Sequence, residues 1–328
     1  MELYTKVTSF PQGFKTGLEH KILMLGSCFV ENIGKKLEEN KFSVGINPFG
    51  TLYNPVSVAS ALERLLEPKP FSQEDVFEYE GVYHSFFHHS RFSERDPECF
   101  LENLNKKLQK YAGFLSESAR LFVTFGTSYV YRLKEGGSIV ANCHKLPEKM
   151  FSRERLSVGS IVEEWSVLLQ KIWEQVPDLK VIFTVSPIRH LRDGAHENQL
   201  SKSILLLAVD ELVSRFPGKL IYFPAYEIML DELRDYRFYA QDMLHPSDLA
   251  INYIWEQFAN NHLTSESRSF IKEWEKIRKA IDHKPFHPGS PAYKVFVSQT
   301  LLKMEHLSEK FPFFDVSKER MILESKLG

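Results

Sequence analysis

The chain has 328 residues, of which 43% are hydrophobic and 26% charged, a composition typical of a folded globular protein. Its 41 basic and 43 acidic residues give a formal net charge of −2, which argues against a dedicated nucleic-acid-binding protein. No run of apolar residues is long enough to cross a membrane, and no basic segment followed by an apolar stretch opens the chain, so we expect neither a membrane span nor a signal peptide. The three cysteines are far apart and show no CxxC spacing, so we expect no disulfide framework, no zinc site and a cytoplasmic location.

Short apolar runs alternate with amphipathic stretches along the first three-quarters of the chain. The runs predict strands buried on both faces of a sheet; they cover residues 22–25, 121–125, 181–185 and 220–223. Apolar side chains at helical spacing predict helices between and after them; these cover residues 29–40 and 200–216 and a stretch that follows Pro246. Strands alternating with helices predict an α/β protein, a three-layer α/β/α sandwich around a mainly parallel sheet.

Two regions depart from this alternation. Residues 128–145 predict an inserted β-hairpin around Gly136-Gly137, with Asn142 beside Tyr131 and His144 beside Tyr129. Residues 265–282 and a later stretch around Val297 and Met304 have apolar side chains at helical spacing. We therefore expect a main domain over residues 1–262 and a helical extension over 263–328, which packs on the core or on a second copy of the chain.

Polar residues follow several predicted strands, at the edge where open parallel sheets bind ligands. Gly26-Ser27-Cys28 lies at the mouth of a helix, where backbone N–H groups stabilise a thiolate or an oxyanion; a tight turn with an inert cysteine is the alternative. Asp242 precedes His245 by three residues, a spacing that lets the carboxylate orient the imidazole as a general base. Asp193 and His196 share that spacing, so the pattern alone is weak.

Other strand ends carry candidates that are weaker singly. Gly50 lies in a loop rich in Pro, Gly and Asn and could offer a backbone N–H. Ser128 follows the strand predicted at residues 121–125. Arg189 and His190, with His144 returned by the hairpin, are candidates for substrate binding. The histidines of residues 84–89 lack Cys, Asp or Glu at ligand spacing, so we expect no metal site there and no cofactor.

Together these segments resemble the GSCFA-domain family. Gly26-Ser27-Cys28-Phe29-Val30 looks like the Gly-Ser-Cys-Phe-Ala motif of that family, and the remaining blocks follow in the expected order; they are NPFGTLYNP, TFGTSYVY, VANCHK, TVSPIRH and DMLHPS. The family is similar to the SGNH/GDSL hydrolases, which implies a flavodoxin-like sandwich, a nucleophile after the first strand and an Asp-x-x-His pair near the end.

The resemblance implies a role for each matching residue. Cys28 lies at the nucleophile position, and a shift of one residue would make Ser27 the nucleophile instead. Gly50 matches the glycine of the oxyanion hole, and Asp242 with His245 matches the acid–base pair. The oxyanion asparagine of the third block is missing at Gly126-Thr127-Ser128, where the amide of Asn142 or the hydroxyl of Ser128 could replace it.

The sequence therefore predicts an esterase or acyltransferase that forms a covalent acyl-enzyme with an ester or thioester of a small molecule, glycan or lipid. A catalytically inactive carbohydrate- or lipid-binding module on the same fold is the alternative. Two departures support it: Ser27 lies where the Gly-Asp-Ser pattern of the hydrolases has Asp, and the oxyanion asparagine is missing. A third reading is an assembly role, in which the C-terminal helices form a homo-oligomer.

Overall fold

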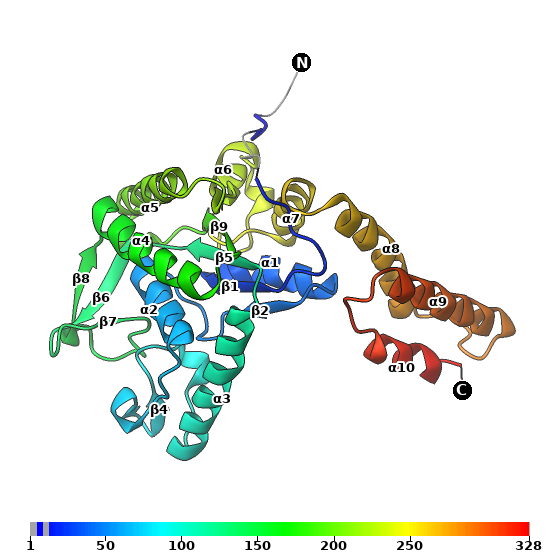
Figure 1. The fold of residues 1–328 in the computed structure, drawn as a ribbon, viewed down its shortest axis with the longest axis horizontal. Coiled ribbons are helices and arrows are strands. Elements are labelled where there is room, and N and C mark those ends of the chain that lie inside the picture. The colour runs from blue at the N-terminus through cyan, green and yellow to red at the C-terminus, as the bar shows by residue number, and fades with distance from the viewer. Residues whose placement is uncertain (1–4, 9–12, 328) are drawn as a thin grey trace.

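Five parallel strands form the central sheet of the computed structural model, which describes residues 5–8 and 13–327 (Figure 1). The strands are β1 (Ile22–Gly26), β2 (Val44–Ile46), β5 (Arg120–Phe125), β9 (Lys180–Val185) and β10 (Leu220–Tyr222). Their spatial order is β10-β9-β5-β1-β2, which is the flavodoxin-like order. The strand order reverses between β1 and β5, so the carboxyl ends of these two strands border the crevice where such folds bind ligands.

The strands are almost continuous apolar runs because both faces of the sheet are covered. Alternate side chains enter two separate cores: Leu23 and Leu25 of β1 face one, and Ile22 and Met24 face the other. The helices lining the first core are α2 (Pro55–Leu66), α3 (Pro97–Ser116), α4 (Val158–Gln175) and α5 (Ala195–Arg215). The second core is closed by α1 (Cys28–Glu39), α7 (Asp248–His262) and α8 (Ser265–Asp282), with the short α6 (Ala225–Glu227) following β10. The predicted three-layer α/β/α sandwich with a parallel flavodoxin-like sheet is confirmed.

The inserted hairpin forms, but its predicted register is wrong by two residues. β6 (Tyr129–Leu133) pairs with the short β7 (Ile139–Val140), and Tyr131 lies opposite Val140 rather than Asn142. The register shifts because the loop between the strands takes in four residues, 134–137, instead of two: the Leu133 N–H donates to the carbonyl oxygen of Ser138 at 2.8 Å. The chain leaves the hairpin after Val140, where the Ala141 N–H donates to the carbonyl oxygen of Phe86. A further strand, β8 (Phe151–Arg155), pairs with the other edge of β6, and β3 (Phe77–Tyr79) with β4 (Val82–His84) forms a separate two-stranded ribbon.

The C-terminal helices α8, α9 (Pro291–Lys310) and α10 (Ser317–Ser325) lie at one side of the sandwich, beside the end of α1 (Figure 1). The buried Trp274 of α8 donates from Nε1 to the carbonyl oxygen of Glu39 at 2.9 Å, and Lys41 pairs with Glu319 of α10 at 2.7 Å. These contacts attach the C-terminal helices to the C-terminal end of α1. Within the described ranges, no helix combines the length and apolar character needed to span a bilayer.

Candidate functional site

The junction between β1 and α1 is built so that no larger residue fits at its first position. Gly26 has a φ of 137°, and a Cβ there would lie 2.1 Å from the carbonyl oxygen of Thr124 on β5. Its N–H donates to Oδ1 of Asn47 at 2.9 Å, which anchors the loop after β2 over the end of β1. Glycine is therefore required here to bring β1 and β5 together at the point where the strand order reverses.

Ser27 is the N-cap residue of α1, yet its side chain makes no capping hydrogen bond. Serine at this position usually accepts a hydrogen bond from the helix backbone. Here the residue is 1% exposed, and its Oγ has no hydrogen-bond partner among the described residues. A buried hydroxyl left unpaired costs folding free energy, so its retention at a strand end marks this hydroxyl as available for chemistry.

His190, in the loop after β9, lies close to Ser27 across Gly126. A Cβ added at Gly126 would lie 3.3 Å from Nε2 of His190 and 3.4 Å from Cβ of Ser27. Nε2 of His190 is also buried, and it too has no hydrogen-bond partner within the part of the chain that the structure describes. Two unpaired polar atoms thus lie beside a glycine at the carboxyl ends of β1 and β5.

Cys28, the first residue of α1, is half-buried and packs at the edge of the second core. Burial, and secondarily the carboxylate of Glu31, raise the pKa of its thiol, while the charge of Lys202 opposes them. Because the pKa is raised, the thiol stays protonated at neutral pH and needs a base before it can attack a carbonyl.

Asp242 and His245 form the geometry expected of an acid–base pair. Oδ2 of Asp242 lies 2.5 Å from Nδ1 of His245, and its Oδ1 accepts the N–H groups of Leu244 and His245, each at 2.9 Å. These hydrogen bonds, first those from the backbone, lower the pKa of the Asp242 carboxyl to about 2. The carboxylate is therefore fixed before any ligand arrives, and Nε2 of His245 points to the opposite side of the ring.

The pair is about half exposed, with side-chain accessibilities of 50% for His245 and 48% for Asp242. The helix that follows the pair, α7, begins at Asp248 with Ser247 as its N-cap. Among the described residues, no hydrogen bond joins His245 to Ser27 or Cys28. His245 and His190 interact electrostatically. Burial is the main cause that lowers the pKa of His190 to about 4, and the charges of Lys202, Arg153 and His245 add to it in that order.

The second copy of the Asp-x-x-His spacing does not form a pair of this kind. Both oxygens of Asp193 pair with the guanidinium of Arg153 on β8. His196 lies in the first turn of α5 and is exposed. The sequence preference for Asp242 and His245 thus agrees with the geometry.

Two of the donors expected to complete an oxyanion hole are already engaged, and the third residue, Asn142, is engaged through its acceptor oxygen. The Gly50 N–H donates to the carbonyl oxygen of Asn47 at 2.8 Å, and the buried Ser128 hydroxyl donates to Oγ of Ser201 at 3.0 Å. Oδ1 of Asn142 accepts the N–H of His144 at 2.8 Å, and within the described ranges no hydrogen bond joins Asn142 to the β1–α1 junction. Each of these groups holds a loop in place in this structure.

His144 and Arg189 also differ in their surroundings. The ring of His144 is buried beside His84 and Phe77, with Nε2 at 2.9 Å from the carbonyl oxygen of Ser85. Burial lowers the pKa of His144 to about 4, as expected of a neutral core histidine. Arg189 is exposed. Among the described residues, neither His144 nor Arg189 forms a hydrogen bond with Ser27 or Cys28.

Lys202 is the residue of this region that the sequence reading missed. It is 0% exposed, and its Nζ donates to the carbonyl oxygens of Gly126 and Ser186 at 2.6 and 2.7 Å. Burial lowers the pKa of Lys202 to about 7. Its helical spacing to Leu205 and Val209, both buried, was the signal that could have placed it on the covered face of α5.

Two family models match this chain, one over most of the sandwich and one over the C-terminal helices. The family model described as "GSCFA family" matches residues 21–258, which include the β1–α1 junction, His190 and the Asp242–His245 pair. The chain belongs to the GSCFA family. A second model, described as "GSCFA domain protein, C-terminal domain", matches residues 274–328, the part that holds α9 and α10.

Solved structures give a more distant likeness. A carbohydrate esterase family 3 crystal structure from Talaromyces cellulolyticus is 9% identical, with a TM-score of 0.34, and the match covers 77% of this chain and 99% of that chain. A search of curated proteins found no match. At this distance the likeness assigns no role to any residue of this GSCFA chain.

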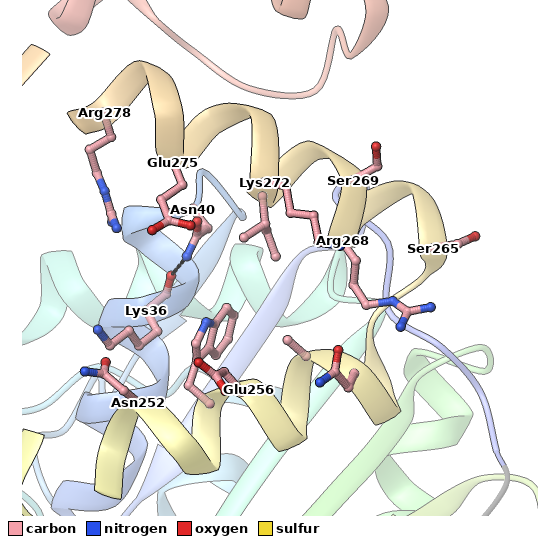
Figure 2. Close-up of a pocket in the computed structure, with 14 residues that line it drawn as sticks. Lys36, Asn40, Asn252, Glu256, Ser265, Arg268, Ser269, Lys272, Glu275 and Arg278 are labelled. Atoms are coloured by element: carbon pink, nitrogen blue, oxygen red, sulfur yellow. Dashed lines mark hydrogen bonds between the residues drawn. The ribbon is translucent and has the colours of Figure 1, made fainter. Parts of the chain in front are cut away.

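A separate groove of about 860 Å³ lies between α1, α7 and α8, where the GSCFA region meets the C-terminal helices. Figure 2 shows Lys36 and Asn40 of α1 facing Glu275 and Arg278 of α8 across it. None of the residues expected to act in catalysis lines this groove. The carboxyl ends of β1, β5 and β9 therefore remain the candidate site of the GSCFA domain.

Proposed function

We propose that this chain is an acyl hydrolase or acyltransferase that forms a covalent acyl-enzyme on Cys28, with His245 as general base and Asp242 as its orienting carboxylate. The observation that carries the proposal is the contact of 2.5 Å between Asp242 Oδ2 and His245 Nδ1, with the carboxylate fixed by two backbone N–H groups. Such a pair leaves Nε2 of the imidazole to accept a proton from a nucleophile.

In the proposed reaction, His245 removes the thiol proton while Cys28 Sγ attacks the carbonyl carbon of an ester or thioester. The tetrahedral intermediate collapses, the bond to the leaving oxygen or sulfur breaks, and His245 returns the proton to that leaving group. Water or an acceptor alcohol or amine then attacks the acyl-thioester and regenerates the thiol. The raised pKa of Cys28 supports a mechanism in which the base acts during the attack, rather than one with a preformed thiolate.

Ser27 is the alternative nucleophile. Its Oγ is unpaired, but the residue is almost fully covered at 1% exposure, whereas Cys28 is half-buried. Access of a carbonyl carbon therefore favours Cys28. The substrate class we propose is an acyl ester or thioester of a small molecule, glycan or lipid.

The test is intact-protein mass spectrometry after incubation with p-nitrophenyl acetate and with an acetyl thioester. The background chain is Cys99→Ala, which removes the exposed thiol of α3 as a source of chemical acylation. We expect one acetyl group on this chain, retained in Ser27→Ala and lost in Cys28→Ala. An adduct that survives Cys28→Ala but not Ser27→Ala would assign the nucleophile to Ser27, and the absence of any adduct with either donor would contradict the enzyme proposal.

A non-catalytic carbohydrate- or lipid-binding module is the second candidate. The observation that favours it is that the Gly50 N–H and the Ser128 hydroxyl, two of the expected oxyanion donors, already donate to other groups of the protein. This function requires that His245→Ala keep its affinity for an acetylated oligosaccharide or a fatty acyl ester in calorimetry. It also requires that no ester be turned over by the unmodified chain.

A further inference from the structure

The proposed reaction needs donors for the oxyanion, and two of the groups first expected to supply them are occupied. The third, the Asn142 amide, makes no hydrogen bond to the β1–α1 junction within the described residues. Each preorganised donor to a developing oxyanion typically contributes 10²- to 10³-fold to the rate. The Gly50 N–H and the Ser128 hydroxyl already donate within their own loops. Unused donors at the same edge of the sheet are therefore the groups to consider.

Ser27 Oγ and His190 Nε2 are such groups. Both atoms are buried and without a hydrogen-bond partner within the described residues. Their residues flank Gly126: a Cβ added there would lie 3.3 Å from His190 Nε2 and 3.4 Å from Ser27 Cβ. A side chain at position 126 would crowd both groups, so glycine keeps them clear. The Gly126 N–H donates to the carbonyl oxygen of Tyr53 at 2.7 Å, which fixes the glycine in place.

The surroundings of His190 hold its ring in one position. Its backbone N–H donates to Oδ1 of Asn198 at 2.9 Å. Its ring meets the ring of Tyr53 edge-on, with a centroid distance of 5.4 Å. The groups whose positive charge opposes protonation of His190 come from three elements: Lys202 of α5, Arg153 of β8 and, whenever it carries a proton, His245 of the last loop.

These cations and burial favour a neutral imidazole, since they lower the pKa of His190 to about 4. A neutral imidazole with its proton on Nε2 is a hydrogen-bond donor without being an acid that loses its proton easily. It is a poor general base at neutral pH, because its conjugate acid is too strong.

We propose that His190, through Nε2–H, and Ser27, through its hydroxyl, donate hydrogen bonds to the oxyanion that forms when Cys28 attacks an acyl carbonyl. This inference rests on the proposed function and assigns a catalytic role to both residues. The Sγ–C bond forms, the carbonyl π electrons move to the oxygen, and both donors keep their protons. When the intermediate collapses, the leaving group departs with the proton that His245 supplies.

The first test compares two substitutions of His190 in the acylation assay. Gln carries an amide N–H that can reach the position of Nε2, whereas Ala has no donor. We expect His190→Ala to acylate about 10²- to 10³-fold more slowly and His190→Gln to stay within about tenfold of the unmodified chain. Ser27→Ala is expected to retain its acyl adduct on Cys28 but to form it about 10²-fold more slowly. His196→Ala, an exposed histidine at the start of α5, is the matched control and should acylate at the unmodified rate.

The second test reads the proton of His190 directly and does not depend on activity. In ¹⁵N-histidine NMR, the signals absent from His190→Gln assign the ring. We expect a neutral ring with its proton on Nε2 that does not titrate between pH 8 and 5. A charged ring at pH 7, or a ring with its proton on Nδ1, would overturn the inference.

The outcomes separate the two proposals. If the unmodified chain forms no adduct, or if His245→Ala acylates equally fast, the proposed function fails and the oxyanion role falls with it. If acylation depends on His245 but His190→Ala is as fast as the unmodified chain, the oxyanion role alone is wrong. Equal losses in His190→Ala and His190→Gln, with both variants folded, would also contradict it, because a donor role predicts rescue by Gln.

Discussion

The buried and the exposed parts of the candidate site differ in how their polar groups are satisfied. In the buried part, Ser27 Oγ and His190 Nε2 lie unpaired beside Gly126. In the exposed part, both oxygens of Asp242 accept hydrogen bonds and the pair is half open to solvent. Unpaired buried atoms need a ligand atom to complete them, whereas a self-contained acid–base pair needs only to be approached. In the proposed mechanism, the buried part recognises the carbonyl and the exposed part moves the proton.

The exposed part offers the substitution with the largest expected effect on the rate. His245→Ala should slow acylation by about 10³-fold or more, since a positioned general base contributes about 10²- to 10⁴-fold. The free energy of unfolding should change by less than about 0.5 kcal/mol, because the side chain is exposed. Mass spectrometry over time and urea denaturation measure the two quantities. If His245→Ala loses stability but keeps its acylation rate, the exposed pair has a structural role and not the proposed catalytic one.

The buried part should respond in stability. Lys202→Ala removes a fully buried side chain and two hydrogen bonds to the carbonyl oxygens of Gly126 and Ser186. We expect the free energy of unfolding in urea to fall by about 2–4 kcal/mol. Lys171→Ala, at a lysine of α4 whose side chain is 50% exposed, is the matched control with little change expected. Equal effects for the two lysines would show that Lys202 does not hold the ends of β5 and β9.

Asp242→Asn should have a smaller effect on the rate than His245→Ala. The amide keeps the shape of the side chain but loses the charge that stabilises a protonated imidazole, and solvent screens part of this loss at an exposed pair. We expect acylation to slow by about 10- to 100-fold. A loss as large as that of His245→Ala would mean that the pair becomes covered during the reaction.

The pH dependence of stability gives the most gradual expected effect. The pKa of Lys202 is lowered to about 7, while the unfolded chain keeps its proton up to about pH 10.4. Between these values the unfolded state binds more protons, so stability rises with pH, and below about pH 7 this contribution is constant. Relative to Lys202→Met, the unmodified chain should gain at most about 1.4 kcal/mol per pH unit from pH 7 to 9. Parallel curves for the two proteins would contradict the buried, neutral state at high pH.

The parts of the fold that depend on local pattern were predictable from the sequence. The apolar run at residues 22–25 and the stripe of Val30, Ile33 and Leu37 became β1 and α1, because burial on both faces of a parallel sheet leaves a continuous signature. The hairpin register was not predictable, since the loop takes in residues 134–137 and not only Gly136-Gly137. Loop length sets the register of a hairpin, and a pair of glycines does not fix that length.

The candidate site divides in the same way. The pairing of Asp242 with His245 followed from a spacing of three residues within one loop, which is a local property. The proximity of Ser27 to His190 joins residues far apart in the sequence through Gly126, which follows the end of β5. The burial of Lys202 required knowing which face of α5 is covered. Contacts between polar groups that are far apart in the sequence therefore could not be predicted from the sequence alone.

A crystal structure of the unmodified chain after reaction with an activated acetyl ester would test the central claim most directly. We predict an acetyl group on Sγ of Cys28, with its carbonyl oxygen within about 3.2 Å of His190 Nε2 and with His245 facing the thioester. An acetyl group on a surface side chain alone, or a carbonyl oxygen pointing away from Gly126 and His190, would contradict the account.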